Sequence, residues 1–147
     1  NYEDKTIRFH SDIRSPKVSL IKKSPKVFFI FYDKDEKIQL RVFGNAFVNY
    51  KNEITKSSWE KTAHMSRKCY LASEAPGTIS MEPTSGVTHD IENLKYTLEE
   101  SESGYKNFCV IETKIKSIEW LYLAAKGHRR AKIEYNDEKI KKVWLTP

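Results

Sequence analysis

The sequence is poor in the residues that mark fibrous, disulfide-rich or membrane-spanning chains. Its 147 residues include only 5 glycines, 5 prolines and 2 cysteines. This composition excludes collagen-like and low-complexity chains. The longest apolar run covers residues 27–32, far short of the roughly 18 residues that a membrane helix needs. The first residues show no signal peptide, so we expect a cytoplasmic protein without a membrane partner.

Patterns typical of metal sites and of common enzyme classes are also missing. Cys69 and Cys109 lie far apart, and the 4 histidines are scattered, so we expect reduced thiols and no metal site. The sequence contains no P-loop, G-x-G-x-x-G, G-x-S-x-G or H-E-x-x-H motif. No catalytic acid or base can be assigned.

The chain is basic, with a net charge of +6 and a pI near 9.2. Such a charge is compatible with nucleic acid, an anionic membrane or a small anionic ligand. The 26 basic residues are interleaved with 20 acidic ones, which favours a mixed solvated surface over a nucleic-acid stripe. We therefore expect no nucleic-acid partner. A basic nucleic-acid-binding β domain stays as an alternative, and its binding would depend steeply on salt.

The length predicts one domain, residues 1–147. Its class is α+β, mainly β, with a closed or nearly closed antiparallel sheet. The first strand begins almost at the first residue, so we expect the chain to begin partway into a larger fold. Residues 75–88 contain prolines and glycines and predict a long loop, functional or mobile.

The expected strands are 5–11, 27–32 (buried on both faces), 37–48, 107–115, 117–125, 129–135 and 140–145, with a turn at 136–138. The expected helices are 16–23, 55–70 (with Trp59, Thr62, Ala63 and Met65 inward) and 90–100.

The first candidate site lies where the first strand ends and a helix begins. Ser15 suits the N-cap position and Pro16 the first helical position. A helix N-terminus attracts anions through its dipole and its free N–H groups. Arg14 and Lys17 add positive charge, and Ser11 and Ser15 add hydroxyl donors. The pattern is compatible with a phosphate site and with an ordinary capped helix carrying exposed basic residues.

Two further groups of polar side chains lie on predicted strands. His128, Arg130 and Lys132 share one face of a strand by the period of two. Gln39 and Arg41 share a face of another strand, and a glutamine can both donate to and accept from a heterocycle. Either group could be a polar surface in solvent or could supply donors to a bound phosphate or ring.

Four segments of the chain, residues 9–18, 37–46, 118–121 and 127–131, match one known pattern in order and spacing. Taken together, they resemble the pyridoxamine 5′-phosphate oxidase-like, FMN-binding split-barrel family. The resemblance covers most of the chain. A middle segment containing Trp59 and residues 66–70 also resembles a branch close to the oxidases.

The resemblance implies an antiparallel split β-barrel with flanking helices, and a homodimer with FMN at the subunit interface. It implies a flavin-dependent oxidoreductase that acts on an unidentified small molecule. By resemblance, Ser15 and Lys17 bind the phosphate, Gln39 contacts the flavin, and Trp120 and Arg130 reach FMN from the partner subunit. The positions that match cofactor-binding ones are His10, Ser11, Arg14, Ser15, Lys17, Gln39, Trp120 and Arg130.

The sequence also departs from the oxidases. They carry an arginine where Pro16 stands, and Arg14 can supply that charge. Their first strand, with an arginine and a lysine, would precede Asn1, so we expect that the family's N-terminal strand is missing here. Of their tyrosine, arginine and serine for substrate phosphate, only Arg67 is matched, which argues against pyridoxal phosphate synthesis. Arg67 and His128 are the candidates for substrate contact. A flavin carrier or sensor without turnover is the alternative.

Overall fold

The structure, a computed structural model, describes residues 3–136 and 139–147. The chain divides into two compact units. The first comprises residues 1–7, 24–47 and 113–147, and the second comprises residues 8–23 and 48–112.

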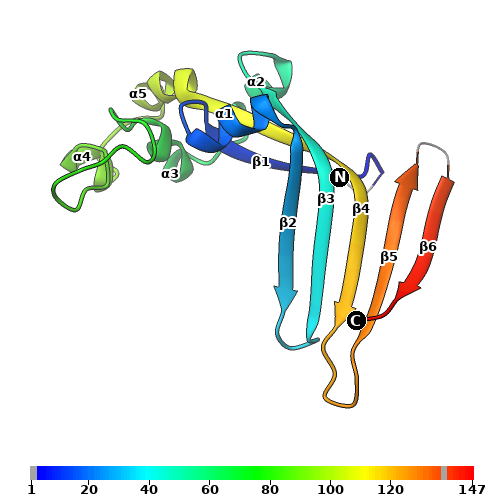
Figure 1. The fold of residues 1–147 in the computed structure, drawn as a ribbon. Helices are drawn as coiled ribbons and strands as arrows, with labels where there is room; N and C mark the ends of the chain where they lie inside the picture. The colour runs from blue at the N-terminus through cyan, green and yellow to red at the C-terminus, as the bar shows by residue number, and fades with distance from the viewer. Residues whose placement is uncertain (1–2, 137–138) are drawn as a thin grey trace. The chain divides into compact units, whose positions relative to one another are not determined.

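The first unit contains most of an antiparallel sheet in the order β2-β3-β4-β5-β6 (Figure 1). Strand β1 (Thr6–Asp12) lies off this path and pairs with β4. The register places Phe28 opposite Phe43, and Ala131 between Trp120 and Trp144. The five strands of the path are β2 (Lys26–Asp33), β3 (Ile38–Asn49), β4 (Phe108–Tyr122), β5 (Arg129–Asn136) and β6 (Lys139–Leu145).

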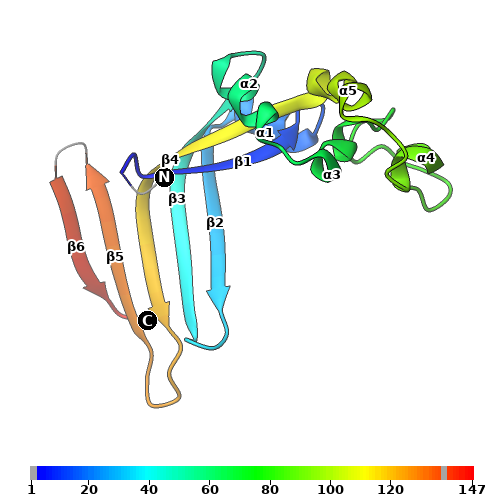
Figure 2. The ribbon, with the colours of Figure 1, turned by 180° about the vertical axis from the view of Figure 1, so that it is seen from behind.

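The mainly antiparallel β class predicted from the sequence is confirmed. Among the described strands no pairing joins β2 to β6, so the sheet is open and the predicted barrel is not confirmed. The two strands predicted at 107–115 and 117–125 are wrong as separate elements, because β4 runs unbroken through both. Of the turn predicted at 136–138, residues 137–138 lie outside the described part of the chain. Figure 2 shows the β5–β6 hairpin from behind.

The prediction that the strand at 27–32 is buried on both faces is wrong. It forms edge strand β2, in which Phe28 is 45%, Ile30 60% and Tyr32 57% exposed. Val27 and Phe29 on the other face are half-buried. The apolar run gives no sign of this difference, because burial depends on what packs over each face and not on the strand itself.

Gly44 in β3 lies where two backbones approach closely. An added Cβ would lie 2.5 Å from the Lys114 carbonyl oxygen and 2.6 Å from Thr113 Cγ2. The backbone at Lys114 cannot move aside as a flexible side chain can.

We therefore expect Gly44→Ala to lower the free energy of unfolding by about 1–3 kcal/mol, measured by urea denaturation. Gly127→Ala would not serve as a control, because the backbone at Gly127 has a φ of 118°, which strains any residue with a Cβ atom. Lys114→Ala, which leaves the backbone in place, should change stability little.

The second unit has short helices around an aromatic core. The core contains Trp59, Tyr70, Phe108 and Val110. Helix α2 starts at a capping box in which Asn52 and Thr55 bond each other's backbone N–H groups. The helices are α1 (Pro16–Lys23), α2 (Glu53–Glu60), α3 (His64–Arg67), α4 (His89–Glu92) and α5 (Leu98–Ser101), with 3-10 helices η1 (Lys68–Tyr70) and η2 (Glu102–Asn107). None of the helices in the described residues has the length and apolar character required to span a bilayer.

Helix α1 and the irregular loop at 75–88 are confirmed, whereas the two longer predicted helices are wrong as single elements. The helix predicted at 55–70 breaks at Ala63, whose ψ of 142° is not helical. Trp59 is buried, but Ala63 and Met65 are exposed. The helix predicted at 90–100 breaks at Leu94, which has a φ of 59°. Thr97 then caps a new helix through a second capping box.

Candidate functional site

The strand-to-helix turn before α1 places two serines and an aspartate inside the second unit. Ser11 is 6%, Asp12 7% and Ser15 5% exposed. The Ser15 N–H donates to the Asp12 carbonyl at 3.0 Å, and the Val18 N–H donates to the Ser15 carbonyl at 2.9 Å. The helix therefore begins at a tight turn whose hydroxyl side chains are held inward.

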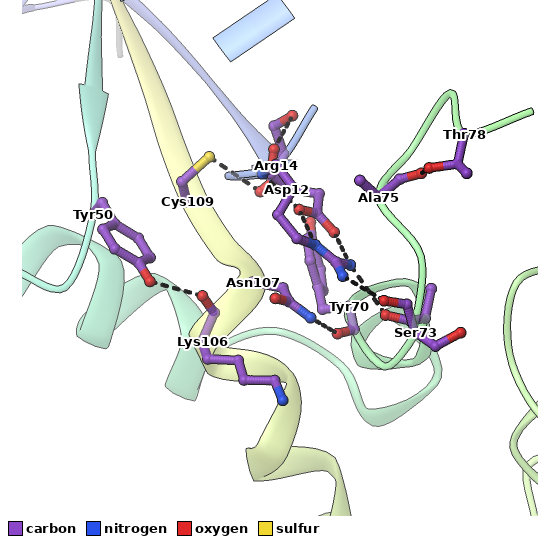
Figure 3. A network of polar contacts seen from close by, with 12 residues as sticks. Asp12, Arg14, Tyr50, Tyr70, Ser73, Ala75, Thr78, Lys106, Asn107 and Cys109 are labelled. Carbon is purple, nitrogen blue, oxygen red and sulfur yellow. Dashed lines mark hydrogen bonds and ion pairs between the residues drawn. The ribbon is translucent and has the colours of Figure 1, made fainter. Parts of the chain in front are cut away.

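Arg14 is engaged by the protein on nearly every side (Figure 3). Its Nη2 and Nε bind the two Asp12 carboxylate oxygens at 2.7 and 3.0 Å. Nη2 and Nη1 also donate to the carbonyls of Ala72 and Ser73, at 3.1 and 3.0 Å. The Asp12 bond raises the pKa of Arg14. Four of its five N–H groups are thus used, which leaves one on Nη1 for a ligand.

Lys17 and His10 flank this turn with different charge states. Lys17 is exposed and makes no ion pair with the described residues. The His10 ring packs edge-on against Phe108, with 4.8 Å between centroids. Burial lowers the pKa of His10, which favours the neutral form of its imidazole. His10 therefore suits contact with an uncharged ring, and Lys17 suits contact with an anion.

The donor set at this turn is compatible with one phosphate group. Lys17, the remaining N–H of Arg14 and the α1 N-terminus supply positive charge and donors. Ser11 and Ser15 are buried, and the phosphate contacts predicted for them stay predictions. Asp12 cancels most of the Arg14 charge. With respect to the residues that the structure describes, the turn thus offers one unpaired cation, Lys17, where the sequence predicts two.

Arg67 is part of the core of the second unit. It is 4% exposed. It donates to the Trp59 and Thr62 carbonyls at 2.9 and 3.2 Å, and its guanidinium lies 4.6 Å from the Trp59 ring centroid. It also forms an ion pair with Glu102. These contacts favour a structural role. Its contact with a substrate stays a prediction.

In the first unit, Gln39 and Arg41 are neighbours on one face of β3. With its amide oriented to accept, the Gln39 side-chain oxygen lies 2.6 Å from Arg41 Nε. This orientation leaves the amide N–H groups of Gln39 as donors. The prediction that Gln39 contacts a flavin edge is compatible with this geometry and stays a prediction.

Trp120 and Arg130 occupy opposite faces of the β4–β5 ladder. Trp120 pairs with Ala131, so the next residue, Arg130, points to the other side. Arg130 Nη2 donates to Glu119 Oε2 at 2.7 Å. The Trp120 ring lies 6.4 Å from that of Trp144. His128 is exposed in the loop before β5. The roles predicted for Trp120, Arg130 and His128 stay predictions.

Sequence reasoning missed a cavity in the second unit. It has a volume of about 800 Å³ and is lined by residues 69, 71–80 and 84–88. The signal available in the sequence was the proline- and glycine-containing stretch at 75–88. That stretch predicts a loop but not the open pocket that the loop surrounds.

The two thiols of the second unit should react very differently. Cys69 is exposed and lines the cavity, whereas Cys109 is fully buried. Burial raises the pKa of the Cys109 thiol to about 11, so its reactive thiolate is scarce at pH 8. With Ellman's reagent at pH 8, we expect one thiol per chain to react rapidly in the folded protein and a second only after unfolding. Cys69→Ser should abolish the rapid phase. Two rapid phases in the wild type would contradict this assignment.

The sequence of this chain is similar to one known protein family over its first third. Residues 1–50 match the family described as pyridoxamine 5′-phosphate oxidase, FMN-binding domain. No curated protein matches the chain.

Two solved structures share the fold. One is a pyridoxamine 5′-phosphate oxidase-related, FMN-binding protein from Nostoc punctiforme PCC 73102. Its TM-score is 0.76 at 17% identity over 97% of this chain and 73% of that one. The other is PhzG from Burkholderia lata 383, in complex with tetrahydrophenazine-1-carboxylic acid. Its TM-score is 0.71 at 12% identity over 97% of this chain and 69% of that one. The fold is that of pyridoxamine 5′-phosphate oxidase-related proteins, and the resemblance of this chain to that FMN-binding family is confirmed.

Proposed function

We propose that the protein is a flavoprotein that binds FMN and oxidises or reduces a small molecule with it. The observation that carries this proposal is the match of residues 1–50 to an FMN-binding domain. The matched segment contains both the turn before α1 and Gln39. The structure from Nostoc punctiforme, which is described as FMN-binding, supports the same cofactor.

Candidate cofactor-binding residues occur in both units. In the second unit, Lys17, the remaining N–H of Arg14 and the hydroxyls of Ser11 and Ser15 would bind the phosphate. In the first unit, the Gln39 amide would bind the polar edge of the ring. When bound, FMN supplies hydride transfer. The protein supplies binding and orientation, and it shields the ring from water.

We also propose that the chain works as a cytoplasmic homodimer whose open sheet forms part of a split barrel. Exposed apolar side chains on β2 and β3 support an interface, because monomers rarely leave such patches in water. Phe28, Ile30, Tyr32 and Phe43 share one face of this pair and are all exposed. Trp120 and Arg130 would then contact the partner's FMN.

Light scattering tests the dimer and should give twice the chain mass of 17.2 kDa. A monomer at micromolar concentration would refute the dimer.

The cofactor is tested by the absorbance spectrum of the purified protein. Flavin bands are expected, with FMN identified by mass after its release. Reduction of the bound flavin by an added electron donor, followed by reoxidation, would distinguish an oxidoreductase from a carrier. A protein that purifies without flavin and gains none from added FMN would contradict the proposal.

A further inference from the structure

The Arg14 side chain ties the neck of a long loop to the turn before α1 (Figure 3). Its Nη1 donates to the Ser73 carbonyl at 3.0 Å, and its Nη2 donates to the Ala72 carbonyl at 3.1 Å. The Ser73 N–H donates to the Gly86 carbonyl at 3.2 Å. The two ends of the loop, residues 73–86, therefore meet at a residue that Arg14 binds.

The 73–86 loop is open to solvent, and hydrogen bonds within it join near neighbours. The Thr78 N–H and Oγ1 both donate to the Ala75 carbonyl, at 3.1 and 2.9 Å. Most of the loop is exposed, and Ile79 and Met81 are 93% and 95% exposed. Segments with exposed hydrogen bonds and few buried apolar contacts open at a small cost in free energy. The position of this loop therefore depends strongly on the bonds at its neck.

The same guanidinium serves the loop and the proposed phosphate position. Asp12 fixes one edge of it through Nε and Nη2, at 3.0 and 2.7 Å. Nη1 carries both the bond to the Ser73 carbonyl and the N–H group that is left for a ligand. The guanidinium is planar and rigid, so one orientation satisfies Asp12, the loop and a phosphate. Ordering the side chain for one partner lowers the cost of binding the next.

Glu74 carries a negative charge in the loop, next to the neck. Its attraction contributes to the raised pKa of Arg14 and adds to the hold on the loop. A bound phosphate would repel Glu74 and so oppose a tighter loop. Glu74 is exposed, and solvent and salt screen this repulsion, whereas the hydrogen bonds of Arg14 act at contact distance. The hydrogen bonds therefore set the direction of the effect.

We propose that Arg14 is a positioning residue that anchors the 73–86 loop, and that a phosphate bound at the turn before α1 tightens this anchor. The loop becomes ordered when the cofactor is bound. By reciprocity, the anchored loop strengthens phosphate binding by the same factor. The anchor follows from the hydrogen bonds alone, whereas its coupling to FMN rests on the proposed function.

Hydrogen–deuterium exchange of the full chain tests the anchor, followed by mass spectrometry on peptides that cover residues 71–88. In flavin-free protein we expect about tenfold faster exchange of these amides in Arg14→Lys, the scale of one or two lost hydrogen bonds. Lysine keeps the charge but lacks the planar fork that reaches both carbonyls.

Lys17→Ala is the matched control for the anchor. It removes a cation of the same turn that forms no ion pair with the described residues, and exchange of the loop should stay unchanged. Peptides covering α2 should exchange as in the wild type in both variants. Unchanged loop exchange in Arg14→Lys, or an equal acceleration in α2, would overturn the anchor.

The coupling is measured on the wild type with saturating FMN, and with riboflavin as the matched ligand without phosphate. FMN should slow exchange of residues 71–88 by about threefold or more, and riboflavin should change it little. In Arg14→Lys, FMN raised to saturation should not slow the loop. Equal slowing by the two flavins, or bound FMN without any slowing, would overturn the coupling.

Flavin binding is recorded by fluorescence in the same samples, which separates the two proposals. A chain that binds no FMN would refute the proposed function and the coupling together, while faster exchange in flavin-free Arg14→Lys would still support the anchor. Bound FMN with an unchanged loop would refute the coupling and leave the proposed function standing.

Discussion

Replacing Arg14 and Lys17 together with alanine should weaken FMN binding by a few kcal/mol, about 100-fold, because two charge-assisted contacts to the phosphate are lost. Riboflavin has the same ring without the phosphate, so its affinity should not change. Fluorescence titration with both flavins measures the two effects. Lys17→Ala alone should account for most of the loss, since Asp12 already holds Arg14.

The matched control removes two lysines from the other end of the same helix. Lys22 and Lys23 lie in the last turn of α1 and are exposed. Lys22→Ala with Lys23→Ala makes the same change in net charge, and it should leave FMN affinity nearly unchanged. Equal losses in both double variants would show that overall charge, and not the α1 turn, attracts the phosphate.

Arg67→Ala should lower the free energy of unfolding by about 3 kcal/mol, because it removes a large buried side chain and its hydrogen bonds to backbone carbonyls. The substitution leaves the Thr62 carbonyl without its donor, removes one of the donors to the Trp59 carbonyl and takes the guanidinium from the Trp59 ring. Urea denaturation followed by tryptophan fluorescence measures the change. Loss of substrate turnover should follow the loss of folded protein.

Lys61→Ala is the control for this substitution, because Lys61 is an exposed basic residue at the end of α2. It should change stability by less than about 0.5 kcal/mol. An Arg67→Ala variant with wild-type stability and impaired turnover would instead support the substrate contact that the sequence suggests.

Local patterns in the sequence were enough to predict the features that depend on neighbouring residues. Pro16 and Ser15 specify the start of α1, and the alternation of polar and apolar residues specifies β1 and β5. Each of these signals is contained in a few consecutive residues, so the fold class was recoverable without any knowledge of packing.

Features that depend on distant parts of the chain were not predictable in this way. Arg14 is identifiable as a cation, but the carbonyls that hold it lie 58 and 59 residues further along. The exposed face of β2 carries the same residue types as a buried strand. The break at Leu94 requires a leucine with positive φ, which no local propensity favours. For the same reason the cavity at 69–88 could only be found from the folded loop.

The most direct test of FMN binding is an equilibrium titration of the flavin-free protein with FMN, followed by flavin fluorescence and compared with riboflavin. We predict saturation at one FMN per chain, with riboflavin binding much more weakly. Equal affinities for the two flavins, or no saturation with FMN, would contradict the account.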